Sequence, residues 1–529
     1  MFARSRPYLP VIALTIVLIV VSAVDGLTTD AQPVHGQEDA TVRVLGGPPL
    51  TWDPARAGDT SSAAVLAQVF EGLTVLDADN SVQPALAESW TVSDDGRRVD
   101  FKLRPGLKYS DGTAVGAQHV VDSWFRLLDP QRPSPLVSLL ADVAGATDYL
   151  AGRADRAAVG LHADADHVIV DLAQPATYFP AVTTSPSLAL VPPSMFNAFT
   201  GADLPPSLVV SGAYTPSSAS DTVIRLLGNA NYWAGAPALD VVEVVLDTEN
   251  RMPIDMFEDG DLDYLPISSF HAAWIRYDTS LGPQLRATPD LTLHFYGFDT
   301  ATPPFSDPLV RQAFGKAVNW DRIVRLAGGD PALSMAPPGL LGAATEDFRP
   351  TYDPQAAREL LSQAGFAAGA GFPEIALISN GYGYELAVAN ELERELGVHV
   401  TVELLDFSDI LDREASGEHS KIWTQVWSAD YPHANDFLGL LLQTGSASNQ
   451  GRWSSTEYDA LIATAAAAPT AAEQESHYAA AQQILRDQVP VVPVEALRGW
   501  ALSRNGLLGA LPSGAGFLRY ADMAWGSDR

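Results

Sequence analysis

The chain has 529 residues, of which 47% are hydrophobic and 9% aromatic. Such a length exceeds one compact core and predicts two or three domains, while the composition excludes a mainly disordered protein. The 64 acidic residues against 32 basic ones give a formal net charge of −32, which disfavours nucleic acid and anionic lipid as partners.

The N-terminus has the pattern of an export signal. Arg4 and Arg6 precede an apolar run over residues 8–24, and the small residues Val21-Ser22-Ala23 form a candidate cleavage site. The run is just long enough to span a bilayer, so an uncleaved anchor is the alternative. We therefore interpret residues 1–35 as a signal peptide or membrane anchor followed by a loose segment. Either way, the body of the chain is expected outside the cytoplasm.

Cysteine is absent from the chain. An exported protein of this composition folds without disulfides, and it cannot carry a lipid on an N-terminal cysteine.

The first half of the chain reads mainly as strands. Val99, Phe101 and Leu103 alternate with polar residues, as on a half-buried strand. Further strands are predicted over residues 41–47, 167–172 and 241–247. The segment 119–130 (HVVDSWFRLLDP) predicts a helix that stops near Pro130.

The second half carries clearer helix signals. Asp307 and Asp353 each precede a proline, a combination that predicts an N-cap followed by the first helical position. An alanine-rich helical region is expected over residues 458–488, with a break at Pro469. Strands are predicted over residues 375–379, 398–406, 422–427 and 490–497, and one more helix over residues 386–396. Alternating strands and helices predict an α/β fold.

Motifs of catalysis are missing. The sequence contains no G-x-S-x-G elbow, no H-E-x-x-H zinc motif and no phosphate-binding G-x-x-x-x-G-K-[ST] loop. Asp259, Asp261 and Asp263 have calcium-loop spacing but lack the glycine and glutamate that such a loop requires. The ten histidines show no metal-ligand spacing. These absences disfavour an enzyme without excluding one, because catalytic triads are recognised by geometry rather than by sequence order. No metal and no cofactor are expected.

Seven segments carry a recognisable pattern in a fixed order along the chain. They cover residues 68–115, 229–245, 297–324, 352–366, 427–438, 455–462 and 489–496. The first has the pattern "EGL…PALAESW…SDDG…SDGT", and the fifth is WSADYPHANDFL. In this order the segments resemble family 5 of the extracellular solute-binding proteins of ATP-binding-cassette (ABC) importers, the oligopeptide and dipeptide receptors.

The resemblance implies a two-lobed periplasmic-binding-protein-like α/β fold (type II, cluster C-like) with a hinge of two crossing segments. Lobe I would comprise residues 40–290 and 496–529, and lobe II residues 291–495. The hinge segments would lie near residues 291–300 and 489–498, and the lobes would close on a ligand by hinge motion.

The resemblance also implies a ligand-binding role for Asp430. In the oligopeptide receptors the aspartate of a similar W-x-x-D-Y segment pairs with the peptide's α-amino group, and Trp427 and Tyr431 flank it in this chain. A carboxylate in a closed cleft makes a strong charge-assisted bond to an ammonium. The alternative is that Asp430 is only a turn or cap residue.

Four more aromatic residues are candidates for the cleft. They are Trp52, Tyr109, Tyr296 and Trp453, each of which has a core-packing role as its alternative. The chain also departs from the family pattern at His433 and Ala434, where relatives often have Asp-Pro, so the loop after Asp430 is expected to follow a different path.

The function expected from the resemblance is capture of peptides outside the cytoplasm and delivery to the membrane permease of an ABC importer, by a monomer. One alternative keeps the fold but changes the ligand to a nickel chelate, haem, an oligosaccharide or an opine. Another is an exported peptide sensor or hydrolase.

Overall fold

The computed structural model describes residues 40–196, 201–343, 345–406, 409–410, 412–413 and 416–526. Residues 39–529 form one compact unit. The predicted signal peptide or anchor lies outside the described residues. Within the described ranges, no helix combines the length and the apolar character that a bilayer span requires.

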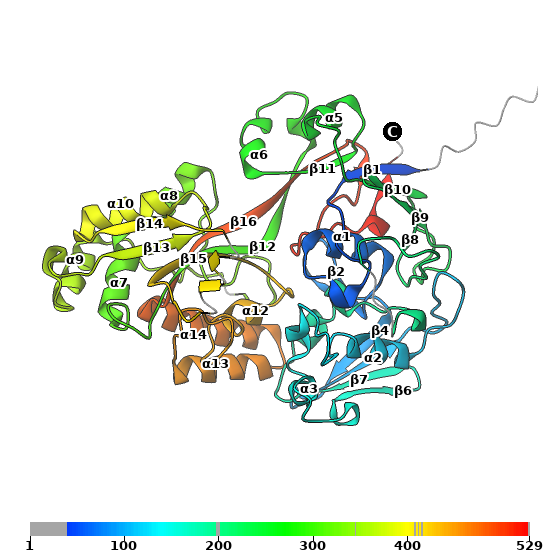
Figure 1. The fold of residues 1–529 in the computed structure, drawn as a ribbon, viewed down its shortest axis with the longest axis horizontal. Coiled ribbons are helices and arrows are strands. Elements are labelled where there is room, and N and C mark those ends of the chain that lie inside the picture. Colours follow the sequence, from blue (N-terminus) through cyan, green and yellow to red (C-terminus); the bar gives the residue numbers. More distant parts are fainter. Residues whose placement is uncertain are drawn as a thin grey trace, which may run out of the picture. The chain divides into compact units, whose positions relative to one another are not determined.

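A ten-stranded mixed sheet organises this unit (Figure 1). Its strand order is β14-β13-β15-β12-β16-β11-β1-β10-β9-β8. In chain order the strands are β1 (Thr41–Leu45), β8 (Tyr214–Ala219), β9 (Val223–Gly228), β10 (Val241–Val245), β11 (Tyr264–Ile267), β12 (Leu285–Phe298), β13 (Ile375–Ser379), β14 (Val400–Leu404), β15 (Ile422–Ser428) and β16 (Val491–Ser503).

The smaller sheets are antiparallel. One has the order β4-β5-β7-β6, and two others pair β2 with β3 and β17 with β18. Their strands are β2 (Thr74–Leu76), β3 (Val82–Pro84), β4 (Ala87–Val92), β5 (Arg98–Leu103), β6 (Leu161–Asp164), β7 (His167–Asp171), β17 (Leu507–Leu508) and β18 (Ala524–Trp525).

Helices pack on these sheets. The described α-helices are α1 (Thr60–Val69), α2 (Ala117–Phe125), α3 (Ala146–Leu150), α4 (Phe179–Val182), α5 (Pro253–Asp259), α6 (Ser269–Ile275), α7 (Pro308–Ala317), α8 (Trp320–Ala327), α9 (Pro354–Gln363), α10 (Glu385–Leu396), α12 (Ala434–Leu438), α13 (Thr456–Ala467) and α14 (Ala471–Gln488). Short 3-10 helices occupy Pro54–Arg56, Val137–Leu140, Arg156–Ala158, Pro186–Leu188, Pro193–Met195, Gly282–Gln284, Ala367–Gly369 and Tyr520–Asp522.

The predicted helix starts are confirmed. The carboxylate of Asp307 accepts a hydrogen bond from the amide of Leu309, and that of Asp353 accepts one from Ala356, with a proline in each first turn. The break at Pro469 separates α13 from α14. Helix α2 ends at Phe125, earlier than the expected stop near Pro130. The next residue, Arg126, turns its guanidinium to the buried Asp53.

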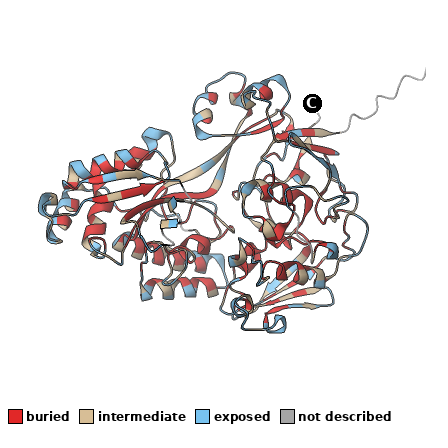
Figure 2. Cartoon of the chain, viewed as in Figure 1, coloured by how far each residue is buried: buried red, intermediate tan, exposed pale blue. Residues whose placement is uncertain are grey.

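The two predicted hinge segments lie side by side. Strands β12 and β16 pair antiparallel along most of their length, and β16 also pairs with β11 (Figure 1). Both ends of β16 are buried, but residues 495–500 in its middle are half-buried or exposed (Figure 2). This pattern shows that the middle of the strand faces open space. The lobe boundaries near residues 290 and 496 stay a prediction.

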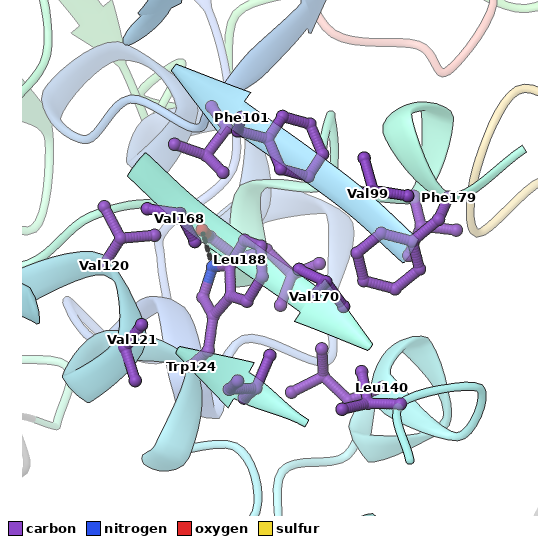
Figure 3. Close-up of a cluster of buried hydrophobic side chains, with 14 of the residues drawn as sticks. Val99, Phe101, Val120, Val121, Trp124, Leu140, Val168, Val170, Phe179 and Leu188 are labelled. Carbon is purple, nitrogen blue, oxygen red and sulfur yellow. Dashed lines mark hydrogen bonds between the residues drawn. The ribbon is translucent and has the colours of Figure 1, made fainter. Parts of the chain in front are cut away.

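Several separate hydrophobic clusters form the core of the described residues. One contains Trp124, whose indole donates a hydrogen bond to the carbonyl of Leu188 at 2.8 Å, packed with side chains of β5 and β7 (Figure 3). Another joins the aromatic residues of β12 to α7, α10 and β13. Buried clusters of this kind hold the loops between them in defined positions.

Candidate ligand-binding site

The larger of two neighbouring cavities has a volume of about 730 Å³. Its wall combines the end of β1, the start of α1, the middle of β12 and β16, and the loop before α10. The charged or titratable side chains in this wall are Arg286, Asp290, Tyr264, His294, Asp330, Tyr382, Tyr384, Glu495, Arg498 and Tyr520.

The smaller cavity, of about 230 Å³, lies beside it, since Ser513 lines both. One side consists of residues 57–60 and Glu71, around helix α1. The other is the segment 428–432, which carries the predicted ligand residue Asp430. The C-terminal residues Phe517 and Arg519 and the segment 184–189 also line this cavity.

Asp430 follows the end of β15 and lines the smaller cavity. Its side chain is half-buried and forms no ion pair or hydrogen bond within the described part of the chain. Burial raises the pKa of this carboxyl from 3.8 to about 6. Asp430 is therefore a partly desolvated acid that faces open space without a counter-charge.

A second carboxyl, that of Asp436 on α12, binds the backbone amide of Asp430. Asp436 is 0% exposed, and its Oδ2 accepts hydrogen bonds from the indole of Trp427 at 2.9 Å and the amide of Asp430 at 3.2 Å. Its other oxygen, Oδ1, has no hydrogen-bond partner among the described residues. Burial, and then the charge of Asp430, raise the pKa of Asp436 well above its ordinary value. Sequence reasoning missed Asp436, although an acid within the apolar run ANDFLGLLL was a signal.

Trp427 and Tyr431 thus lie beside Asp430 as expected, but their polar atoms bind protein groups. The Tyr431 ring stacks on Tyr178, with ring centroids 5.7 Å apart and planes 6° apart. Its hydroxyl accepts a hydrogen bond from Asn435 at 3.1 Å. Tyr431 lines the smaller cavity, whereas Trp427 lines neither cavity.

His433, one of the departures from the family pattern, shapes the loop after Asp430. Its ring stacks on Tyr178 with a centroid distance of 5.1 Å, and its Nδ1 accepts from the amide of Asn435 at the start of α12. Burial lowers the pKa of His433 to about 4, so the ring is neutral at physiological pH. A neutral imidazole serves here as both cap and stacking surface.

The other four predicted aromatics lie in the hydrophobic core. Trp52, Tyr109, Tyr296 and Trp453 are between 0% and 4% exposed, and none lines either cavity. Trp52 donates to the carbonyl of Ala202, Tyr109 to that of Val191, and Trp453 to the side chain of Gln488. Their burial favours the packing alternative.

The larger cavity exposes residues that sequence reasoning did not select. They include His294 and Glu495 from the paired strands and Tyr382 and Tyr384 from the loop before α10. The available signal was a titratable residue inside each largely apolar hinge segment, His294 in residues 291–300 and Glu495 in residues 489–498. Across the described ranges, no group of three or more histidine or acidic side chains could hold a metal ion.

The model of the family "Bacterial extracellular solute-binding proteins, family 5 Middle" matches residues 81–449. This chain belongs to that family. It is accordingly an extracytoplasmic solute-binding protein of the ABC importer type and not an enzyme, as its sequence predicts.

Two curated relatives of this family-5 protein are named for different ligands. The probable deoxycholate-binding periplasmic protein YgiS of Escherichia coli is 30% identical over 84% of this chain and 86% of its own. The periplasmic oligopeptide-binding protein OppA of Salmonella typhimurium is 29% identical over 90% of each chain.

Solved structures confirm the fold. The unliganded open form of the murein tripeptide-binding protein MppA matches with a TM-score of 0.78 and 25% identity, covering 92% of this chain and 98% of its own. Haemophilus influenzae OppA in complex with the peptide RPPGFSPFR matches with a TM-score of 0.70 at 22% identity, covering 92% and 99%. The predicted α/β binding-protein fold is thus correct.

Proposed function

We propose that this protein captures peptides through their N-terminal ammonium group and delivers them, as a monomer, to the permease of an ABC importer. The observation that carries the proposal is the unpaired carboxyl of Asp430 at the smaller cavity. Relatives named for oligopeptides and murein peptides support the choice of ligand class.

The electrostatics of the acidic pair favour a cation. Burial raises the pKa of Asp430, and burial together with the charge of Asp430 raises the pKa of Asp436, so the pair resists full ionisation without a compensating charge. An ammonium group bound at Asp430 would supply that charge through a charge-assisted hydrogen bond. It would also lower the pKa of Asp430, so that binding weakens as the pH falls below about 6.

An anionic solute suits this cavity less well. YgiS is named for deoxycholate, a carboxylate, which at this position would meet Asp430. Arg519 is the cation in the same wall, but its guanidinium already donates to Glu71 at 3.1 Å and to the Tyr232 hydroxyl at 3.3 Å. A bile-salt carboxylate would have to share this guanidinium with Glu71 and Asp522, which already pair with it.

A thermal-shift assay tests the proposal. We would compare peptides of two to eight residues with free and acetylated N-termini, alongside deoxycholate, nickel chelates, haem and sugars. A ligand at 100 times its Kd adds about 2.7 kcal/mol to the stability of the folded state. We expect stabilisation by free peptides, and its loss on acetylation.

Matched variants identify the pocket. In Asp430→Asn the stabilisation by free peptides should be lost, whereas Asp94→Asn, at an exposed turn, should behave like the wild type. Stabilisation by deoxycholate, a chelate or a sugar alone would contradict the peptide assignment.

A further inference from the structure

The larger cavity contains an aromatic wall built from two separate parts of the chain. The ring of His294, on β12, lies 4.7 Å from the ring of Tyr382 and 5.4 Å from that of Tyr384, the latter stacked at 18°. All three side chains line the cavity. The faces of tyrosine rings attract cations.

The loop that carries both tyrosines is anchored by a buried carboxylate. Glu385, 4% exposed, accepts hydrogen bonds from the amides of Tyr382 at 2.7 Å and Gly383 at 2.8 Å, and from the hydroxyl of Ser379. Burial alone would raise the pKa of Glu385, but these hydrogen bonds hold it below its ordinary value. The charge of Glu385 is therefore used within the loop, whose conformation it determines.

A carboxyl at the edge of this wall remains uncompensated. Oε2 of Glu495 accepts a hydrogen bond from the Tyr384 hydroxyl at 2.6 Å. Glu495 forms no ion pair with any described residue, and burial, helped by the charge of Asp330, raises its pKa. It lies next to His294 in the register of β12 and β16.

His294 supplies no positive charge. The residue is 1% exposed, and burial lowers its pKa to about 4. Its Nε2 forms a hydrogen bond with the Thr424 hydroxyl at 2.5 Å, while its Nδ1 has no partner among the described residues. The ring thus offers a nearly buried, neutral nitrogen in the cavity wall.

The remaining charges of the cavity leave an acidic excess. Arg498 is paired with Asp330. Arg286 donates to the carbonyls of Pro283 at 2.9 Å and Leu285 at 3.1 Å. Asp290, like Glu495, has no ion-pair partner within the described ranges, and burial raises its pKa.

We infer that His294, Tyr382, Tyr384 and Glu495 form a subsite for a second positive group of the solute, an ammonium or guanidinium. The inference rests on the proposed function, since the first positive group occupies Asp430. The preferred solutes are then peptides that carry a lysine or arginine side chain beyond the N-terminal residue. Ring faces and a carboxylate together bind such a group as a charge-assisted, partly desolvated pair.

Calorimetric titration of the full mature protein tests the subsite. We would use tetrapeptide and pentapeptide sets with lysine, arginine, norleucine or glutamate at each position after the first, with alanine elsewhere. At one position we expect lysine and arginine to bind about tenfold more tightly than norleucine. Equal affinities of the lysine, arginine, norleucine and glutamate peptides at every position would overturn the inference. So would tighter binding of the glutamate peptides, which would place the peptide side chain at Arg286.

Three variants separate the subsite from a general effect. Glu495→Gln should reduce the basic preference to less than about threefold while leaving the Kd of norleucine peptides unchanged. Tyr384→Phe, which removes the hydrogen bond to Glu495 but no charge, should reduce the preference less. Glu475→Gln, at an exposed position of α14, should retain it. A full basic preference in Glu495→Gln would contradict the assignment.

Failure of the two proposals would look different. Neutral peptides that bind through Asp430 without a basic preference would leave the proposed function standing and remove the subsite. If no peptide binds, agmatine and arginine amide test the cavity alone. Their binding, lost in Glu495→Gln but not in Glu475→Gln, would support the subsite while refuting the peptide function, and absence of binding would refute both.

Discussion

At the scale of single residues, the acidic side chains of Asp430 and Asp436 lie close together at the position where one positive group of the ligand is expected to bind. Asp436 accepts hydrogen bonds from the indole of Trp427 and from the amide of Asp430. It therefore orients the loop that carries Asp430, whose own carboxyl faces the smaller cavity. Burying uncompensated carboxyls costs stability in the unliganded protein. That cost can be recovered when a cation binds.

The pH dependence of the unliganded protein should reveal this cost. The folded-state pKa of Asp430, about 6, lies above its ordinary 3.8, so the folded state binds a proton more tightly than the unfolded chain. This contribution to stability is complete below about pH 4 and is lost as the pH rises through about 6. Asp430→Asn cannot ionise. In denaturant unfolding it should match the wild type near pH 4 and exceed it by on the order of 2 kcal/mol above pH 7.

Asp94→Asn, which removes an exposed acid, should follow the wild type at every pH. An Asp430→Asn variant that is less stable than the wild type across the whole range would contradict the argument.

A buried ion pair gives a second residue-scale prediction. The guanidinium of Arg126 donates to both oxygens of Asp53 at 2.8 and 2.6 Å, and the side chains are 4% and 0% exposed. Arg126→Met should lower the free energy of unfolding by about 3–5 kcal/mol, because it leaves the buried carboxylate of Asp53 without its positive partner. In thermal melts, the double variant Asp53→Asn/Arg126→Met should recover part of the loss. No recovery would mean that lost packing, not charge, dominates.

At the scale of elements, the contact between β12 and β15 depends on a glycine. A Cβ at Gly297 would lie 2.1 Å from the indole of Trp423 on the neighbouring strand. The tryptophan thereby packs flat against the backbone of a predicted hinge strand and also contacts Phe295 edge-on.

Substitution at this glycine should therefore be costly. We expect Gly297→Ala to lower stability by about 1–3 kcal/mol in urea unfolding, because overpacking forces Trp423 to move. Adding Trp423→Leu should make the alanine nearly neutral relative to Trp423→Leu alone, since contacting residues couple. If the stability losses of the two substitutions simply add, the cost of Gly297→Ala does not come from its contact with Trp423.

At the scale of the whole molecule, one sheet joins the two sequence regions that the family resemblance assigns to different lobes. Strands β12 and β16 pair with each other and connect β15 to β11 through continuous hydrogen bonding. Motion between the regions must therefore bend this strand pair, in which the middle of β16 and the first half of β12 are less buried than the remainder.

Ligand-driven closure predicts a change that solution scattering can measure. The radius of gyration of the mature protein should fall when a stabilising peptide is added, because hinge closure brings the cavity walls together. Asp430→Asn at the same peptide concentration should retain the unliganded value. An unchanged radius with saturating peptide would mean that binding occurs without closure.

Much of the local structure followed from the sequence alone. Pro308 and Pro354 after capping aspartates, the alternation around Phe101 and the break at Pro469 all depend on short-range backbone and capping rules, and the structure confirms each of them. Ordered family segments likewise indicated the binding-protein fold and the extracytoplasmic role, both of which the comparisons bear out.

The composition of the cavities was decided only by the tertiary structure. The sequence analysis selected Trp52 and Tyr296 and did not select Tyr382 or Tyr384, but the first two are core residues and the second two line a cavity. An aromatic side chain suits either environment, and which one it meets depends on strands and loops brought together from far apart in the chain. The same reason hid the meeting of His294 with Glu495. Asp436, in contrast, lies six residues after Asp430, and its contact with Asp430 depends on the local turn between β15 and α12.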